Sequence, residues 1–130
     1  MIVNVLEPTQ GILLAPACGG GGMFGQTDDF VKYTRMRANN TMTFYGQEKV
    51  EYNAQLCLMN LAVHGPTGVV KSGDESNNFY HDSYNLEGCC DYVMTSPLFK
   101  VDKVKSESTQ SAGRLPCGLT SVNKNKEIGK

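Results

Sequence analysis

Alternation of apolar and polar residues along one segment is the feature that most constrains the fold of this chain. From Val50 to Leu58, apolar residues occupy every second position. A period of two over this length is typical of a half-buried β-strand. A helix remains an alternative, because several residues would then share one helical face: Val50, Ala54, Cys57, Leu58 and Leu61. We favour a strand over residues 50–56 and expect at most a short helix near 58–64.

Neighbouring segments rich in β-branched and aromatic residues predict further strands, at 2–6, 30–36, 41–45, 69–70, 92–94 and 98–104. A three-residue loop at 46–48 would place Phe44 opposite Val50 in an antiparallel hairpin, with apolar residues paired on one face. The sequence therefore predicts a mostly β fold. We expect a small antiparallel sandwich or partly open barrel with at most one or two short helices.

The chain has 130 residues, which is the size of one domain. Apolar residues become sparse after residue 105. We therefore expect a single β-rich domain over 1–105 and an extended C-terminal arm over 106–130. Apolar residues of this arm are suited to contacts with another chain, namely Leu115, Leu119 and Ile128.

Charge and cysteine content restrict partners and compartment. The net charge is −1, with no strongly basic patch, so we expect no nucleic-acid partner. No apolar run approaches the roughly 18 residues that cross a bilayer, so no membrane insertion is expected. The N-terminal residues lack the basic region of a signal peptide. The odd number of cysteines predicts reduced, unligated thiols in a reducing cytoplasm: Cys18, Cys57, Cys89, Cys90 and Cys117.

A glycine-rich loop at 19–25 contains a match to the dinucleotide-binding pattern G-x-G-x-x-G, at residues 20–25. The apolar run 12–15 would be the preceding strand, and Glu48 lies near the spacing of a ribose-binding acid. A nucleotide-binding enzyme that uses this loop is therefore one alternative function.

Three observations count against that alternative. Residues 16–19 separate the apolar run from the motif, and the helix that should follow would contain Tyr33 and Thr34. The chain also has too few alternating helices for a doubly wound fold. We therefore predict a flexible loop that binds no phosphate ligand, and no bound cofactor.

The candidate metal ligands and nucleophiles do not form a known motif. His64 and His81 are the only histidines, and His81-Asp82 precedes Cys89-Cys90-Asp91. No C-x-x-C pair is present, and adjacent cysteines on a strand point to opposite sides. Adjacent carboxylates at 28–29 and 74–75 are typical of solvated turns. We expect no metal site and no catalytic residue.

The polar loop at 72–85 carries aromatic residues that favour a contact surface. Phe79, Tyr80 and Tyr84 are the predicted partner contacts, with Tyr92 close behind in sequence. The alternative is that these rings hold the loop against its own domain. A soluble binding module that uses this loop is the second alternative function.

Three segments together resemble small β-rich capsid decoration proteins of tailed phages. They are Gly-Ile-Leu-Leu at 11–14, Thr-Met-Thr-Phe-Tyr at 41–45 and Val-Glu-Tyr-Asn at 50–53. The resemblance implies a structural role in a virion. Together with the lack of catalytic motifs, it leads us to expect a non-catalytic subunit of a large multi-chain assembly, such as a phage capsid or tail accessory protein. Its partners would be other protein chains of that assembly.

Overall fold

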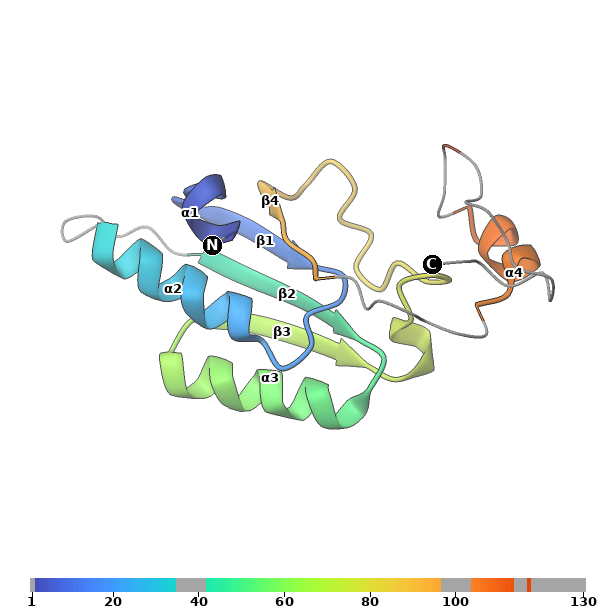
Figure 1. The fold of residues 1–130 in the computed structure, drawn as a ribbon, viewed down its shortest axis with the longest axis horizontal. Coiled ribbons are helices and arrows are strands. Elements are labelled where there is room, and N and C mark those ends of the chain that lie inside the picture. The colour runs from blue at the N-terminus through green and yellow to red at the C-terminus, as the bar shows by residue number, and fades with distance from the viewer. Residues whose placement is uncertain (1, 35–41, 97–103, 114–116, 118–130) are drawn as a thin grey trace.

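The structure is a computed structural model that describes residues 2–34, 42–96, 104–113 and 117. Four strands form one all-parallel sheet in the order β3-β2-β1-β4 (Figure 1). The strands are β1 (Gly11–Ala15), β2 (Met42–Glu48), β3 (Thr67–Ser72) and β4 (Tyr92–Val93). The helices are α1 (Ile2–Leu6), α2 (Gly22–Thr34), α3 (Glu51–His64) and α4 (Ser106–Ser111), with a 3-10 turn at Asp74–Ser76.

Two successive βαβ units build the sheet. The helix α2 connects β1 to β2, and α3 connects β2 to β3. Parallel neighbours need such crossovers, because the chain must return to the same end of the sheet before each new strand. β4 then pairs with the opposite edge of β1, so the strand order reverses between β1 and β4.

The core lies between the sheet and the two long helices, which both cover the same face in Figure 1. Leu13 and Phe44 lie side by side in the register of β1 and β2, and both are fully buried. The ring of Phe24 from α2 packs at 5.0 Å from that of Phe44. Gly68 on β3 leaves room for Leu61 of α3, whose Cδ1 would lie 2.9 Å from an added Cβ.

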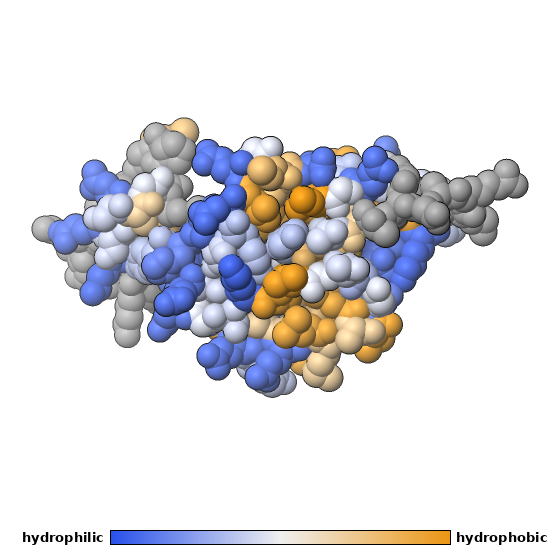
Figure 2. Space-filling model, turned by 180° about the vertical axis from the view of Figure 1, so that it is seen from behind, coloured by the Kyte–Doolittle hydropathy of each residue, from blue (hydrophilic) through white to orange (hydrophobic). Residues whose placement is uncertain are grey.

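The opposite face of the sheet presents an apolar row. The register aligns Val69, Tyr45, Leu14 and Val93 across the four strands. Val69 and Val93 are 47% and 56% exposed, respectively. Figure 2 shows hydrophobic side chains gathered over the middle of this face. Parallel sheets are usually covered on both faces, whereas α2 and α3 lie together on the other side of this one.

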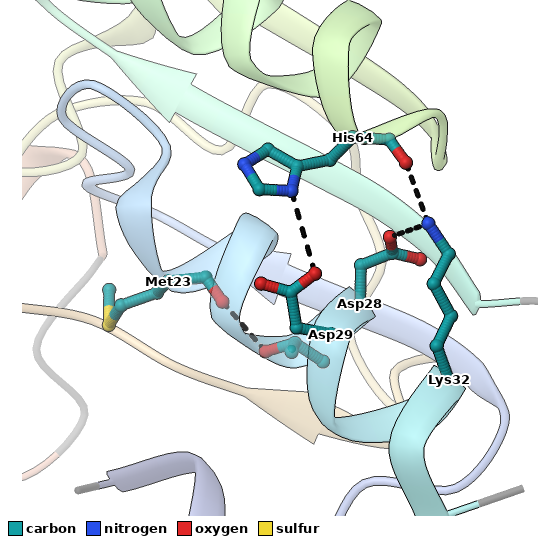
Figure 3. Close-up of polar contacts among 6 residues, drawn as sticks. Met23, Asp28, Asp29, Lys32 and His64 are labelled. Carbon is teal, nitrogen blue, oxygen red and sulfur yellow. Dashed lines mark hydrogen bonds and ion pairs between the residues drawn. The ribbon is translucent and has the colours of Figure 1, made fainter.

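Polar contacts join the C-terminal halves of α2 and α3 (Figure 3). The Lys32 ammonium donates a hydrogen bond to the carbonyl of His64 at 2.7 Å and pairs with Asp28 at 2.5 Å. Nδ1 of His64 lies 3.6 Å from a carboxylate oxygen of Asp29. Gly65 ends α3 in the left-handed conformation, with φ of 86°, and its N–H donates to Leu61.

The prediction of an antiparallel β sandwich or barrel is wrong, because the sheet is all-parallel and carries helices. The alternating segment is the helix α3, which buries Ala54, Cys57 and Leu61 at helical spacing. Phe44 therefore does not face Val50 in a hairpin. Phe44 pairs with Leu13 and Gly68, and Val50 is the N-cap of α3.

Of the other secondary-structure predictions, some are confirmed and some are wrong. Residues 2–6 and the described part of 30–36 are helical, not extended. The strands expected at 41–45, 69–70 and 92–94 are present as β2, β3 and β4. The arm expected from residue 106 begins with α4 rather than extended chain. Most of the strand expected at 98–104 lies outside the described residues. The domain division at 105–106 stays a prediction.

Candidate functional site

A glycine-rich loop lies at the carboxyl ends of β1 and β2. After β1 ends at Ala15, residues 16–21 turn back across this end before α2 begins at Gly22. In open parallel sheets, ligands bind at the carboxyl ends of the strands, where the strand order reverses. That reversal falls between β1 and β4, so the glycine loop lies beside the expected position of a ligand.

Backbone bonds and two left-handed glycines shape this loop. The N–H of Gly21 donates to the Cys18 carbonyl at 3.0 Å, and the N–H of Phe24 donates to Gly21 at 3.0 Å. Gly19 and Gly21 have φ of 55° and 81°, which favour glycine. A Cβ added at Gly19 would meet nothing within 4 Å, so the outer side of the loop is open to an approaching group.

Glu48, the last residue of β2, connects the loop to the start of α3. One carboxylate oxygen accepts a hydrogen bond from the N–H of Gly19 at 3.0 Å, and the other accepts from Val50 at 2.9 Å. The residue is only 7% exposed. Each carboxylate oxygen has a second lone pair, so Glu48 can accept further donors such as ligand hydroxyls.

The structure thus brings together the glycine motif and Glu48, which are the two parts of the nucleotide-binding alternative. The motif at 20–25 does follow a strand and does open a helix, and Glu48 contacts the same loop. Tyr33 and Thr34 are tolerated at the end of α2, where Tyr33 is 88% exposed. The objection that the chain has too few alternating helices is wrong, because α2 and α3 alternate with the strands of a parallel sheet. The predicted absence of a phosphate ligand is not tested by these contacts.

Asn60 is a residue of this site that sequence reasoning missed. Its side-chain amide, on α3, donates to the carbonyl of Gly20 at 2.6 Å and holds the loop against the helix. A lone asparagine in a helix carries no sequence signal for such a contact. Thr95, just beyond β4, is a second such residue, because its buried hydroxyl has no hydrogen-bond partner among the described residues.

A polar cavity of about 530 Å³ lies at the carboxyl end of β3. Its lining includes Lys71, Glu75, His81 and Asp82. The buried amide of Gln47, on β2, fixes one wall by donating to the His81 carbonyl at 2.9 Å. The cavity lies beside the outer strand β3, at the same end of the sheet as the glycine loop.

The aromatic loop folds back onto its own domain. Tyr84 packs edge-on against Tyr45 at 5.1 Å, and its hydroxyl donates to the carbonyls of Gly46 and Val69 at 2.7 and 3.1 Å. Burial raises the pKa of Tyr84 to about 12. Phe79 and Tyr80 are half-buried, and the Tyr80 hydroxyl accepts from the N–H of Lys105 at 3.0 Å.

Contact of these aromatic residues with another chain stays a prediction. The three arm residues proposed for the same role, Leu115, Leu119 and Ile128, lie outside the described residues. Among the described residues, no group of three or more histidine, cysteine or acidic side chains is placed to hold a metal ion. All five cysteines are free thiols.

The fold and the site define a class of protein. An all-parallel sheet of order 3-2-1-4, a glycine loop between β1 and α2, and an acid at the end of β2 are the features of Rossmann-like nucleotide-binding and nucleoside-binding domains. Comparison with known families agrees with this class. Residues 1–128 match the family model of N-6 DNA methylases, and the chain belongs to that family.

Two relatives show the same relationship. The chain is 31% identical over 99 residues to the type I restriction enzyme MjaIX methylase subunit of Methanocaldococcus jannaschii, which covers 76% of this chain and 17% of the relative. It is 31% identical over 118 residues to the type I restriction enzyme HindI methylase subunit of Haemophilus influenzae, which covers 91% of this chain and 26% of the relative. The chain thus spans about a quarter or less of these relatives.

Membership of a DNA methylase family overturns the functional prediction. A non-catalytic virion subunit is wrong, because the family is one of methyltransferases. The resemblance to capsid decoration proteins came from short strand-like segments, one of which is a helix. The expectation of no nucleic-acid partner is wrong for the same reason.

Of the predicted cellular location, only the general part is supported. A cytoplasmic origin agrees with this family, whereas a place in a virion does not. No helix within the described ranges has the length and apolar character needed to cross a membrane.

Proposed function

We propose that this chain forms the methyl-donor-binding part of an enzyme that methylates the exocyclic N6 amine of adenine in DNA. The observation that carries the proposal is the hydrogen bond from Gly19 to Glu48, which joins the glycine loop to the acid at the end of β2. Family membership supports the reaction class and the DNA substrate. The names of the two relatives support a place in a type I restriction enzyme.

S-adenosylmethionine is the donor that this fold and reaction imply, and the residues present fit it. Its ribose carries hydroxyl donors, and the Glu48 carboxylate has lone pairs left to accept them. Its amino-acid carboxylate is an anion, which is favoured at the N-terminus of the 13-residue helix α2. When bound, the donor supplies an electrophilic methyl group on a sulfonium.

The protein's own contribution would be positioning. The left-handed glycines let the backbone approach the ligand closely, and Asn60 holds the loop against α3. The Thr95 hydroxyl, near the reversal of strand order, is buried without a hydrogen-bond partner among the described residues, and a ligand that reached it could satisfy it. These residues would orient donor and acceptor, which is the main requirement of a direct group transfer.

Isothermal titration calorimetry of the 130-residue chain with S-adenosylhomocysteine tests this proposal. We expect binding that Glu48→Gln weakens by about tenfold or more, because an amide cannot replace both carboxylate acceptors. Glu87→Gln, at an exposed loop residue, is the matched control and should bind like the parent chain. Circular dichroism verifies that each variant is folded. A folded parent chain that does not bind, or equal binding by Glu48→Gln, would refute the proposal.

A further inference from the structure

Two thiols far apart in the sequence lie side by side beneath the glycine loop. Cys18 directly precedes Gly19, and Cys57 lies in the middle of α3. Both side chains belong to the same buried core cluster, and the two thiols are close enough for each to shift the pKa of the other. Both are buried, with exposed fractions of 6% for Cys18 and 0% for Cys57.

Two glycines make room for the two sulfur atoms. A Cβ on Gly21 would lie 2.6 Å from the Cys57 Sγ, and a Cβ on Gly46 would lie 2.9 Å from the Cys18 Sγ. Both distances are shorter than a carbon–sulfur contact allows, so the backbone closes directly over the sulfur pair. The N–H of Cys18 also donates to the Gln47 carbonyl at 3.1 Å, which fixes its position against β2.

The interaction between the two thiols shifts their pKa values in opposite directions. The pKa of Cys18 is raised, first by its interaction with Cys57 and then by burial and the nearby Glu48 carboxylate. The pKa of Cys57 is lowered by its interaction with Cys18. A disulfide forms when the thiolate of one cysteine is oxidised beside a second thiol, so the placement of this pair suits that reaction.

We propose that Cys18 and Cys57 are an oxidisable pair that forms a disulfide with a peroxide-class oxidant. The Cys57 thiolate attacks one peroxide oxygen, which gives a sulfenic acid and releases hydroxide. The hydroxide takes the Cys18 proton to form water, and the Cys18 thiolate then attacks the Cys57 sulfur. The S–S bond forms as the sulfenic oxygen leaves as hydroxide, which recovers the proton lost by Cys57. Overall, two thiols and one hydrogen peroxide give one disulfide and two waters.

The disulfide would tie the glycine loop covalently to α3. Asn60 already connects the loop to α3 by donating a hydrogen bond to the Gly20 carbonyl, so the disulfide would reinforce an existing contact. The proposal rests on the placement of the thiols and does not depend on the function proposed above.

The test uses the full chain with three serine substitutions, Cys89→Ser, Cys90→Ser and Cys117→Ser, which leave only the buried pair. The folded protein is treated with hydrogen peroxide, denatured, alkylated with N-ethylmaleimide and weighed intact. We expect the mass to fall by two hydrogen atoms and both alkylation sites to be lost. Dithiothreitol before alkylation should restore both sites.

A matched variant and a direct measurement complete the test. Adding Cys57→Ser to the same background should leave Cys18 alkylatable or oxygenated, with no intramolecular bond. Peptide mapping of the oxidised parent chain should show the Cys18 and Cys57 peptides joined. Two thiols that remain alkylatable, or that gain oxygen atoms without joining, would overturn the proposal even if the Cys57→Ser chain fails to fold.

Discussion

At the scale of single residues, Gly21 occupies the most demanding position of the glycine loop. Its φ of 81° is rarely adopted by residues with a side chain, and an added Cβ would lie 3.1 Å from the Cys57 Cα as well as 2.6 Å from its sulfur. Gly22 differs, because a Cβ there would meet nothing within 4 Å and the residue begins α2. The two neighbours therefore form a matched pair for testing the loop.

We expect Gly21→Ala to lower the free energy of unfolding by about 1–3 kcal/mol, because it combines backbone strain with a clash against α3. Gly22→Ala should be neutral or slightly stabilising, since alanine favours the helix. Urea unfolding followed by circular dichroism measures both values. Equal effects of the two substitutions would show that the backbone of Gly21 is not confined against α3 in this way.

Tyr84 provides a second residue-scale prediction, which concerns alkaline pH. Its folded-state pKa of about 12 lies above the ordinary value of 10.0, so folding favours the neutral phenol. This contribution to stability is complete below pH 10 and is lost as the pH rises toward 12. Tyr84→Phe should cost about 1 kcal/mol at neutral pH through the lost hydrogen bonds. It should also remove part of the decline in stability between pH 10 and 12, measured by urea unfolding. Tyr52→Phe, at an exposed position on α3, should change neither quantity.

At the scale of elements, Lys32 links the ends of α2 and α3. Its ammonium contacts the last carbonyl of α3, where a positive charge complements the helix dipole. The side chain is 60% exposed, so solvent screens the interaction. We expect Lys32→Ala to lower the free energy of unfolding by only about 0.5–1 kcal/mol, in thermal or urea unfolding. The exposed Lys49 is the control, and a larger loss for Lys49→Ala would contradict this role.

The elements also show why some of the secondary structure was predictable and some was not. In β2, Met42 and Phe44 alternate with less buried residues and belong to a strand in both sequence and structure. In α3, the alternation from Val50 to Leu58 coexists with a helical face, and local pattern alone does not separate the two. The helix is selected by the parallel pairing of β2 with β3, which requires a crossover between them.

At the scale of the whole molecule, the candidate site is assembled by the order and direction of the strands, which no local sequence pattern specifies. The glycine motif and Glu48 were both recognised in the sequence, but their meaning depended on whether β1 and β2 lie side by side. The structure aligns Ala15 with Gly46 at the carboxyl ends of these strands, which brings Glu48 to the loop. Asn60 and Cys57 join the site only through the packing of α3. Such contacts between distant segments could not be derived from spacing alone.

A nuclear magnetic resonance titration tests whether the carboxyl ends of β1 and β2 bind a methyl donor. The 130-residue chain, labelled with nitrogen-15, is titrated with S-adenosylhomocysteine. We predict that the largest shifts occur at the backbone amides of Gly19 to Gly22 and of Glu48, with smaller changes at Asn60. Residues at the amino end of the sheet, such as Gly11, should not shift. A folded chain without shifts at the glycine loop, or with its largest shifts on the apolar face around Val69 and Val93, would contradict the account.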